Sequence, residues 1–226
     1  TGSGSLREAM TNLCDGGTID FDGDYTITLA SALPQVTTEM TIDGSGQSVT
    51  VDGDDTYRIF NVGSAGDLTV NALTITNGNA NDGGGIFNDF GKLTVRNSTI
   101  SGNTATNEGG GIYNDGTTTV HNSTLSGNTG TFGGGIMSYD TLTVANSTIS
   151  GNAATFEGGG VYADSGTGSV TNSTFSGNTA TNKGGGIYVI NQTLHLAGNI
   201  FAVGTKGDNC YATIDSTLND NGYNLS

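Results

Sequence analysis

A repeat of 24 to 26 residues runs through most of the chain and limits the folds that it can adopt. Each repeat contains a glycine triplet followed by an aliphatic residue; these aliphatic residues are Ile86, Ile112, Ile136, Val161 and Ile187. Segments of the type NSTISGN recur at the same spacing, at 97–103, 122–128, 146–152 and 172–178. Such a period predicts a solenoid, in which each repeat packs on its neighbours.

The repeat is composed of short polar segments with strand-like alternation. In residues 141–150, TLTVANSTIS, Leu142 and Val144 alternate with Thr141 and Thr143 at the period of two that is typical of a strand. Gly, Thr, Asn and Ser dominate the repeat and are poor helix formers. We identify three such segments per repeat, and each is too short to bury much apolar surface alone. We therefore expect equivalent segments to stack as parallel strands with continuous internal ladders of aliphatic side chains.

These features predict an all-β fold, a single-stranded right-handed parallel β-helix of about 25 residues per coil, with a short N-terminal capping helix. The helix is expected in SLREAMTNL, where Ser5 and Glu8 form a capping-box pattern. Leu6, Met10 and Leu13 share one helical face, which would cover the open end of the solenoid.

We expect one domain that spans residues 1–226. Its parts are an N-terminal cap at 1–17, irregular first coils at 18–67, regular coils at 68–200 and a C-terminal coil or closing segment at 201–226.

Stacking of the repeats also predicts polar columns. Asparagines at the end of the NSTISGN segment would form a ladder of side-chain amides that satisfies the turns; they are Asn103, Asn128, Asn152 and Asn178. Threonines near the start of the same segment would form an outward face, flanked by serines; they are Thr74, Thr99, Thr124, Thr148 and Thr174. A flat Thr/Ser surface can bind ice or a glycan, although any repeat of strand-forming threonines produces such a column.

Acidic residues gather in the early coils and lead to a metal hypothesis. If the TID segments at 18–20 and 41–43 stack, Asp20 and Asp43 lie about 5 Å apart, and two like charges there favour a cation between them. The candidate Ca²⁺ ligands are Asp20, Asp43, Asp52 and Asp54. The alternative is that these carboxylates cap turns and keep the surface soluble. We expect no required cofactor.

The two cysteines stand near opposite ends of the expected stack. Because each coil rises about 4.8 Å, Cys14 and Cys210 should be ~30 Å apart or more, which is beyond the reach of a disulfide. Three alternatives follow: both thiols are free, Cys210 pairs with a cysteine outside this sequence, or the two join different molecules end to end, as in a filament. His121 and His195 fall in different outward columns and are not expected to form a metal pair.

The charge balance narrows the range of partners. Asp and Glu number 21 against 6 Lys and Arg, so the formal net charge is −15. This excess argues against nucleic acid and anionic membranes as partners. No apolar run approaches the ~18 residues of a membrane-spanning helix, so no membrane insertion of this segment is expected.

Several motifs resemble those of known families. SLREAM followed by GGTIDF resembles the N-terminal motif of CSLREA-domain proteins, with Gly4 where that family usually has its cysteine. The GGGIYN and NSTISGN repeats resemble those of polymorphic outer-membrane proteins and other pectin-lyase-like β-helices of bacterial surfaces. The last segment, 207–226, is similar to the closing segment of choice-of-anchor proteins. The resemblance implies the β-helix and an extracellular or cell-surface location in bacteria, and it carries over no catalytic residues.

Three classes of function remain. The leading one is a non-catalytic structural or adhesive β-helix, such as a surface stalk, an adhesin segment or a filament subunit, with a cell-surface or glycan receptor as partner. The second is a carbohydrate-active enzyme of the pectin-lyase-like superfamily, either a polysaccharide lyase or a glycoside hydrolase. A hydrolase needs paired carboxylates. A lyase needs a basic residue that abstracts a proton, and the six Lys and Arg residues are scattered along the chain, so none is readily assigned this role. The third is an ice- or glycan-binding module that uses the Thr/Ser face.

Overall fold

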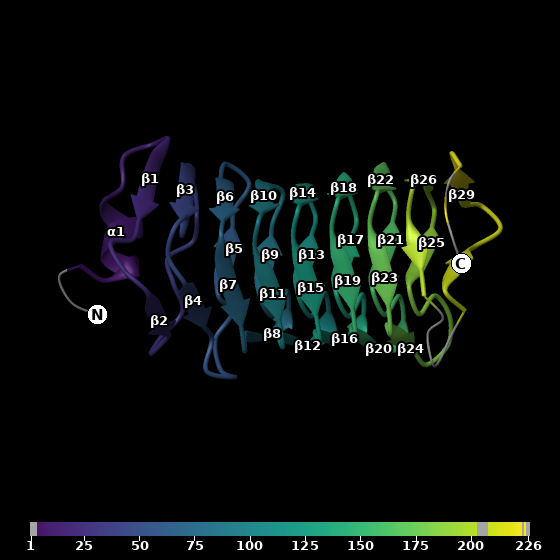
Figure 1. Cartoon of the computed structure of the whole chain (residues 1–226), viewed down its shortest axis with the longest axis horizontal. Coiled ribbons are helices and arrows are strands. Elements are labelled where there is room, and N and C mark those ends of the chain that lie inside the picture. Colours follow the sequence, from purple (N-terminus) through teal and green to yellow (C-terminus); the bar gives the residue numbers. More distant parts are fainter. Residues whose placement is uncertain (1–3, 203–207, 223, 225–226) are drawn as a thin grey trace.

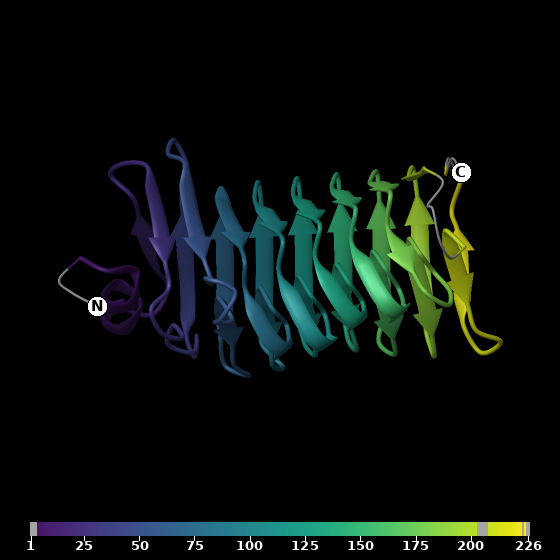
Figure 2. The ribbon, with the colours of Figure 1, turned by 90° about the horizontal axis from the view of Figure 1, so that it is seen from below.

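The chain forms a solenoid of stacked β-coils with a short helix at its N-terminal end (Figure 1). The structure is a computed structural model and describes residues 4–202, 208–222 and 224. The view turned by 90° shows the same stack from another side, with equivalent strands side by side along the long axis (Figure 2). The all-β architecture, the stacked coils and the N-terminal helix predicted from the sequence are confirmed.

The described residues form four parallel sheets that run along the solenoid, and we name them A to D. Sheet A contains β1 (Gly17–Asp20), β3 (Glu39–Asp43), β6 (Asp67–Asn71), β10 (Lys92–Arg96), β14 (Thr117–His121), β18 (Leu142–Ala145), β22 (Gly168–Thr171), β26 (Thr193–Ala197) and β29 (Thr217–Asp220). Sheet B contains β2 (Tyr25–Thr28), β4 (Val49–Asp52), β7 (Leu73–Thr76), β11 (Thr99–Ser101), β15 (Thr124–Ser126), β19 (Thr148–Ser150), β23 (Thr174–Ser176) and β27 (Ile200–Phe201).

The other two sheets are shorter. Sheet C contains β5 (Phe60–Val62), β9 (Ile86–Asn88), β13 (Ile112–Asn114), β17 (Ile136–Ser138), β21 (Val161–Asp164), β25 (Ile187–Ile190) and β28 (Cys210–Ala212). Sheet D contains β8 (Asn79–Asp82), β12 (Thr104–Glu108), β16 (Thr129–Phe132), β20 (Ala153–Glu157) and β24 (Thr179–Ala180).

Sheet D was not predicted, because the sequence indicates three strand-like segments per repeat and a regular coil has four strands. The β12 segment, TATNE, has a single buried apolar side chain, Ala105, and its register with β16 is shifted by an irregularity. It therefore lacks the alternation of apolar and polar residues by which strands are recognised in a sequence.

The core is the column enclosed by sheets A, B and C. Pairing is in register, so that Val95 lies between Val70 and Val120, and Ile100 lies between Ile75 and Leu125. These side chains are fully buried, and each contributes about 1.5–3 kcal/mol of burial free energy to the stack. In-register pairing begins at β1 and β3, where Ile19 is opposite Ile42.

The glycine triplets allow the coils to approach at the corner between sheets D and C. A Cβ atom on Gly110 would lie 2.3 Å from the carbonyl oxygen of Thr129 and 2.5 Å from that of Gly134. Both atoms belong to the backbone of the next coil, so no side chain fits at this position.

The helix α1 (Leu6–Asn12) covers the N-terminal end of the core (Figure 1). Ser5 is its N-cap, and the Ser5 hydroxyl accepts a hydrogen bond of 3.2 Å from the Glu8 amide. Leu6 and Met10 are buried against the first coil, as expected for a cap. The guanidinium of Arg7 donates to the Ser31 carbonyl at 2.7 Å and holds the helix in place.

Candidate functional site

The asparagine column forms a ladder of buried hydrogen bonds between coils. Asn128 is fully buried, and its Oδ1 accepts from the backbone N and the Nδ2 of Asn103, both at 3.0 Å. Its own Nδ2 donates to Asn152 Oδ1 at 2.9 Å and to the Ile100 carbonyl at 3.0 Å. Asn152 and Asn178 repeat the pattern one coil further on. These side chains therefore join consecutive coils at the turns that follow sheet B from β7 to β23.

A second ladder, which sequence reasoning missed, consists of serines between sheets A and B. The Ser123 hydroxyl accepts from the Ser98 amide at 3.1 Å and donates to the His121 carbonyl at 2.8 Å. Ser147 and Ser173 make equivalent bonds, and Asn199 continues the column. The signal in the sequence is the invariant serine of the NST triplet.

The threonine face lies on the outward side of sheet B. Register pairs the threonines directly with one another, and the column extends towards the N-terminus through Thr50 and Thr26. The members predicted from the sequence, all partly exposed, are Thr74, Thr99, Thr124, Thr148 and Thr174. From β7 to β23 the outward positions of this sheet are Thr or Ser, so the face carries no charge there.

The predicted calcium ligands are divided between two sheets. Asp20 is opposite Asp43 on sheet A, as the stacked TID segments indicated. Asp43 accepts hydrogen bonds of 2.8 Å from the Ser45 amide and from Asn71 Nδ2. Partial burial acts to raise the pKa of Asp43, but these hydrogen bonds outweigh it, so the pKa is lowered.

The other two candidate ligands, Asp52 and Asp54, lie at and after the end of a sheet B strand and not on sheet A. Asp52 ends β4 on sheet B, where its Oδ1 accepts from the Asp54 amide at 2.9 Å and from Asn77 Nδ2 at 3.1 Å. These two carboxylates thus belong to a turn after another sheet. Among the described residues, no three His, Cys, Asp or Glu side chains are grouped so as to hold a metal ion. Calcium binding by Asp20, Asp43, Asp52 and Asp54 stays a prediction.

An aromatic strip follows the outward side of sheet C and was not predicted. It consists of Phe87, Tyr113, Met137, Tyr162, Tyr188 and Tyr211, which pair in register. The rings stack along the axis, with 4.8 Å between the centroids of Tyr162 and Tyr188 and 5.4 Å between those of Tyr188 and Tyr211. Tyr162 and Tyr188 are only 8% and 6% exposed although they point away from the main core. The strip is therefore a second, smaller core.

Carboxylates flank this aromatic strip. Glu108 ends β12 on sheet D, and its Oε1 accepts from the Tyr139 hydroxyl at 3.0 Å. Burial raises the pKa of Glu108 despite that hydrogen bond, and the negative charges of Asp82 and Asp115 raise it further. Burial likewise raises the pKa of Asp115. Hydrolases use a carboxyl group with a raised pKa near a second carboxyl group, so Glu108 is the candidate acid of the enzyme alternative.

Both cysteines are free within the chain. Cys14 follows the N-terminal helix and is exposed, whereas Cys210 continues the internal column of Ile187 in the last coil. Burial raises the pKa of the Cys210 thiol to about 12. A link between the two cysteines of different molecules stays a prediction.

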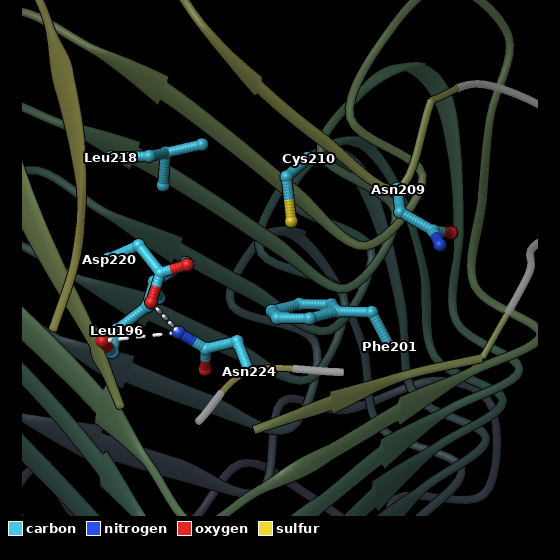
Figure 3. A pocket seen from close by; sticks show the side chains of 7 residues that line it. All are labelled: Leu196, Phe201, Asn209, Cys210, Leu218, Asp220 and Asn224. Carbon is cyan, nitrogen blue, oxygen red and sulfur yellow. Dashed lines mark hydrogen bonds between the residues drawn. The ribbon is translucent and has the colours of Figure 1, made fainter. Parts of the chain in front are cut away.

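A cavity with a volume of about 470 Å³ lies at the C-terminal end of the core. Figure 3 shows Cys210, Phe201 and Leu218 around it, with Asn224 hydrogen-bonded to Asp220 and to the Leu196 carbonyl. In the inward column of sheet A, Asp220 of the last coil is opposite Leu196, so a carboxylate replaces an aliphatic side chain there. The closing segment predicted at 201–226 lies partly outside the described residues, as do residues 1–3 of the predicted cap.

The family model of the right-handed β-helix region matches residues 30–201. The chain belongs to this family. The comparisons of this chain with curated proteins and with solved structures found no match. The resemblance to pectin-lyase-like β-helices is thereby confirmed for the fold, while the narrower resemblance to CSLREA-domain, choice-of-anchor and polymorphic outer-membrane proteins stays a prediction. In the described part of the chain, no helix has the length and apolar character needed to cross a membrane.

Proposed function

We propose that this chain is a non-catalytic, extracellular structural and adhesive β-helix, which acts as a rigid surface segment and binds through its outward hydroxyl groups. The observation that supports this most directly is the continuity of the ladders. Asparagine and serine side chains join each regular coil to the next, and in-register pairing runs from β1 to β29 on sheet A.

The rigidity follows from how these ladders are built. Asn103, Asn128 and Asn152 are fully buried, and opening any one coil would leave their amides without partners. The stability of a solenoid is approximately the sum of contributions from its repeats and from the interfaces between neighbouring repeats, so these bonds strengthen each interface that they cross. A stack whose regular coils are joined in this way suits a stalk or spacer.

The adhesive part of the proposal rests on the outward residues. Sheet B presents Thr and Ser columns without charge from β7 to β23, and sheet A presents threonines on every strand from β1 to β18. Hydroxyl groups donate and accept hydrogen bonds, so they suit neutral polar partners such as glycans. The ice-binding version of this idea uses the same sheet B face and predicts thermal hysteresis.

End-to-end assembly is the filament version of the structural role. The helix α1 covers one end of the core, so stacking of strands head to tail requires the helix to move. The covalent version requires a Cys14–Cys210 link between molecules. Gels run with and without reductant test it, and an identical monomer band in both would remove it.

The carboxylates beside the aromatic strip favour a carbohydrate-active enzyme as the second candidate. Its supporting observation is the raised pKa of Glu108 with Asp82 and Asp115 near it. The two candidates separate in one experiment, in which immobilised protein is incubated with polysaccharides and both retention and new reducing ends are measured. The adhesive role predicts retention without new reducing ends. Release of reducing ends that is lost in Glu108→Gln would replace it with the enzyme.

A further inference from the structure

The outward face of sheet A changes character along the solenoid. Its first half carries charged side chains, including Asp43, Arg96 and an ion pair of 2.7 Å between Lys92 and Asp67. On β18 and β22 the outward positions are Thr143, Ala145, Ser169 and Thr171, none of which is charged. The sheet therefore has a neutral, hydroxyl-bearing half towards its C-terminal end.

A depression of about 230 Å³ lies in this neutral half, across β18, β22 and β26. It is lined by Thr141, Leu142, Thr143, Thr167, Gly168, Ser169 and His195. Four of these side chains carry hydroxyl groups, and His195 adds an imidazole. Register places Thr143 opposite Ser169 and Ser169 opposite His195, so neighbouring groups follow one another about every 4.8 Å.

The depression occurs where the sequence departs from its repeat. Leu142 and Leu194 belong to an internal column in which Gly168 replaces a large side chain. A Cβ atom on Gly168 would lie 2.6 Å from Leu194 Cδ1, so the Leu194 side chain occupies space that a larger residue at this position would need.

His195 is oriented by the next strand. Its Nδ1 lies 3.2 Å from Asn219 Nδ2 on β29, which is paired with β26 in register. With the amide nitrogen as donor, Nδ1 accepts and Nε2 carries the proton of the neutral ring. The ring then offers a donor at the edge of the depression. Thr141 is partly engaged, because its hydroxyl lies 3.2 Å from Asp140 Oδ1.

We propose that this depression binds one unit of a neutral, polyhydroxylated sugar chain, with Thr143, Ser169 and His195 as its polar contacts. The inference rests on the adhesive role proposed above and names the site and ligand class for it. The volume is below the ~300–1,000 Å³ of pockets for drug-sized ligands, so a single sugar unit is seated and the rest of the glycan follows the outer surface.

The chemistry of the lining selects against other ligands. No Lys or Arg lines the depression, and the chain carries a net charge of −15, so anionic sugars are disfavoured. No carboxylate lines it, so metal ions lack their preferred oxygen ligands. The four hydroxyl groups of the lining disfavour an apolar ligand, because they would lose their hydrogen bonds to water.

The test is NMR titration of the whole chain with neutral oligosaccharides, namely unbranched glucan, mannan and galactan fragments, and with an oligogalacturonate as the anionic probe. At least one neutral probe should bind and shift the amide signals of β18, β22 and β26. Thr143→Val and Ser169→Ala, which remove single hydroxyl groups, should each weaken binding roughly three- to tenfold. Far-UV circular dichroism and urea midpoints show whether each variant stays folded.

Two threonine variants serve as matched controls. Thr106→Val and Thr155→Val remove hydroxyl groups from exposed threonines of sheet D, outside both the depression and the Thr/Ser faces of sheets A and B. Both should leave affinity within about twofold. Thr148→Val removes a hydroxyl from the sheet B face of the same coil as Thr143 and shows whether binding occurs on that face instead. If Thr148→Val abolishes binding and Thr143→Val does not, the site is wrong and the adhesive role survives. If no neutral probe binds at 10-mM concentrations, as a rough ceiling for a useful monovalent site, the inference is overturned. Retention of polysaccharide by the immobilised chain then decides the adhesive role separately.

Discussion

Replacing Asn128 with alanine should destabilise the solenoid strongly, because this side chain supports two buried backbone groups. Without the Asn128 side chain, the backbone N–H of Asn103 loses its acceptor and the backbone carbonyl of Ile100 loses a donor. Each buried group without a partner costs about 1–3 kcal/mol. The sum is roughly 4 kcal/mol, a large part of the 5–15 kcal/mol that stabilises a typical domain. A water molecule that enters the vacated space would reduce the loss to about 2 kcal/mol.

The matched control is Asn122→Gly in the same coil. Asn122 is exposed and has a φ of 49°, a conformation that glycine adopts without strain. The free energy of unfolding of the Asn122→Gly variant should differ from that of the original chain by less than about 1 kcal/mol.

Urea unfolding followed by far-UV circular dichroism gives both values from the shift in midpoint and the slope. Hydrogen exchange adds a local readout, because the Asn103 amide should exchange faster in Asn128→Ala and the amide of Ser98 should not. A loss below about 1 kcal/mol, or a loss equal to that of the control, would refute the role given to the asparagine ladder.

Three further predictions concern the cysteines, the aromatic strip and the glycine corner. At pH 8 a thiol reagent should modify Cys14 well before Cys210, whose pKa of about 12 leaves few thiolates, and mass spectrometry that finds equal rates would contradict this. Because burial raises the pKa of Glu108, ionisation of this carboxyl lowers the stability of the fold as pH rises through the raised pKa. Glu108→Gln should therefore raise the urea midpoint at pH 7, and this gain should disappear towards pH 4. Gly110→Ala should prevent folding, since its Cβ would lie 2.3 Å from a backbone oxygen, while Gly127→Ala, with the nearest atom at 4.0 Å, should cost about 1 kcal/mol in thermal unfolding.

The repeat predicts the columns well because a residue in a solenoid meets its own equivalent in the next coil. Val95 next to Val120, Asn103 next to Asn128 and Asp20 next to Asp43 all follow from spacing alone. Relations across a coil do not follow in this way. Asp52 was grouped with Asp43 because they are close in sequence, whereas the chain turns between them onto another sheet.

Features that depend on the shape of the cross-section were also missed. Tyr162 alternates with buried Val161 and would be assigned to solvent by period alone, yet it is covered by Phe132 at an edge-to-face centroid distance of 5.6 Å. Sheet D, which contributes Phe132, has no alternating pattern to reveal it. The depression at Gly168 lies where glycine replaces the large side chain of the repeat, so a prediction based on the regular repeat does not find it.

The central proposal, an extracellular structural and adhesive β-helix, is tested most directly on intact cells that express the chain naturally. An antibody raised against the folded solenoid should label cells that have not been permeabilised, and brief external protease should remove the label without lysis. Labelling that appears only after permeabilisation, with full protection from external protease, would contradict the account.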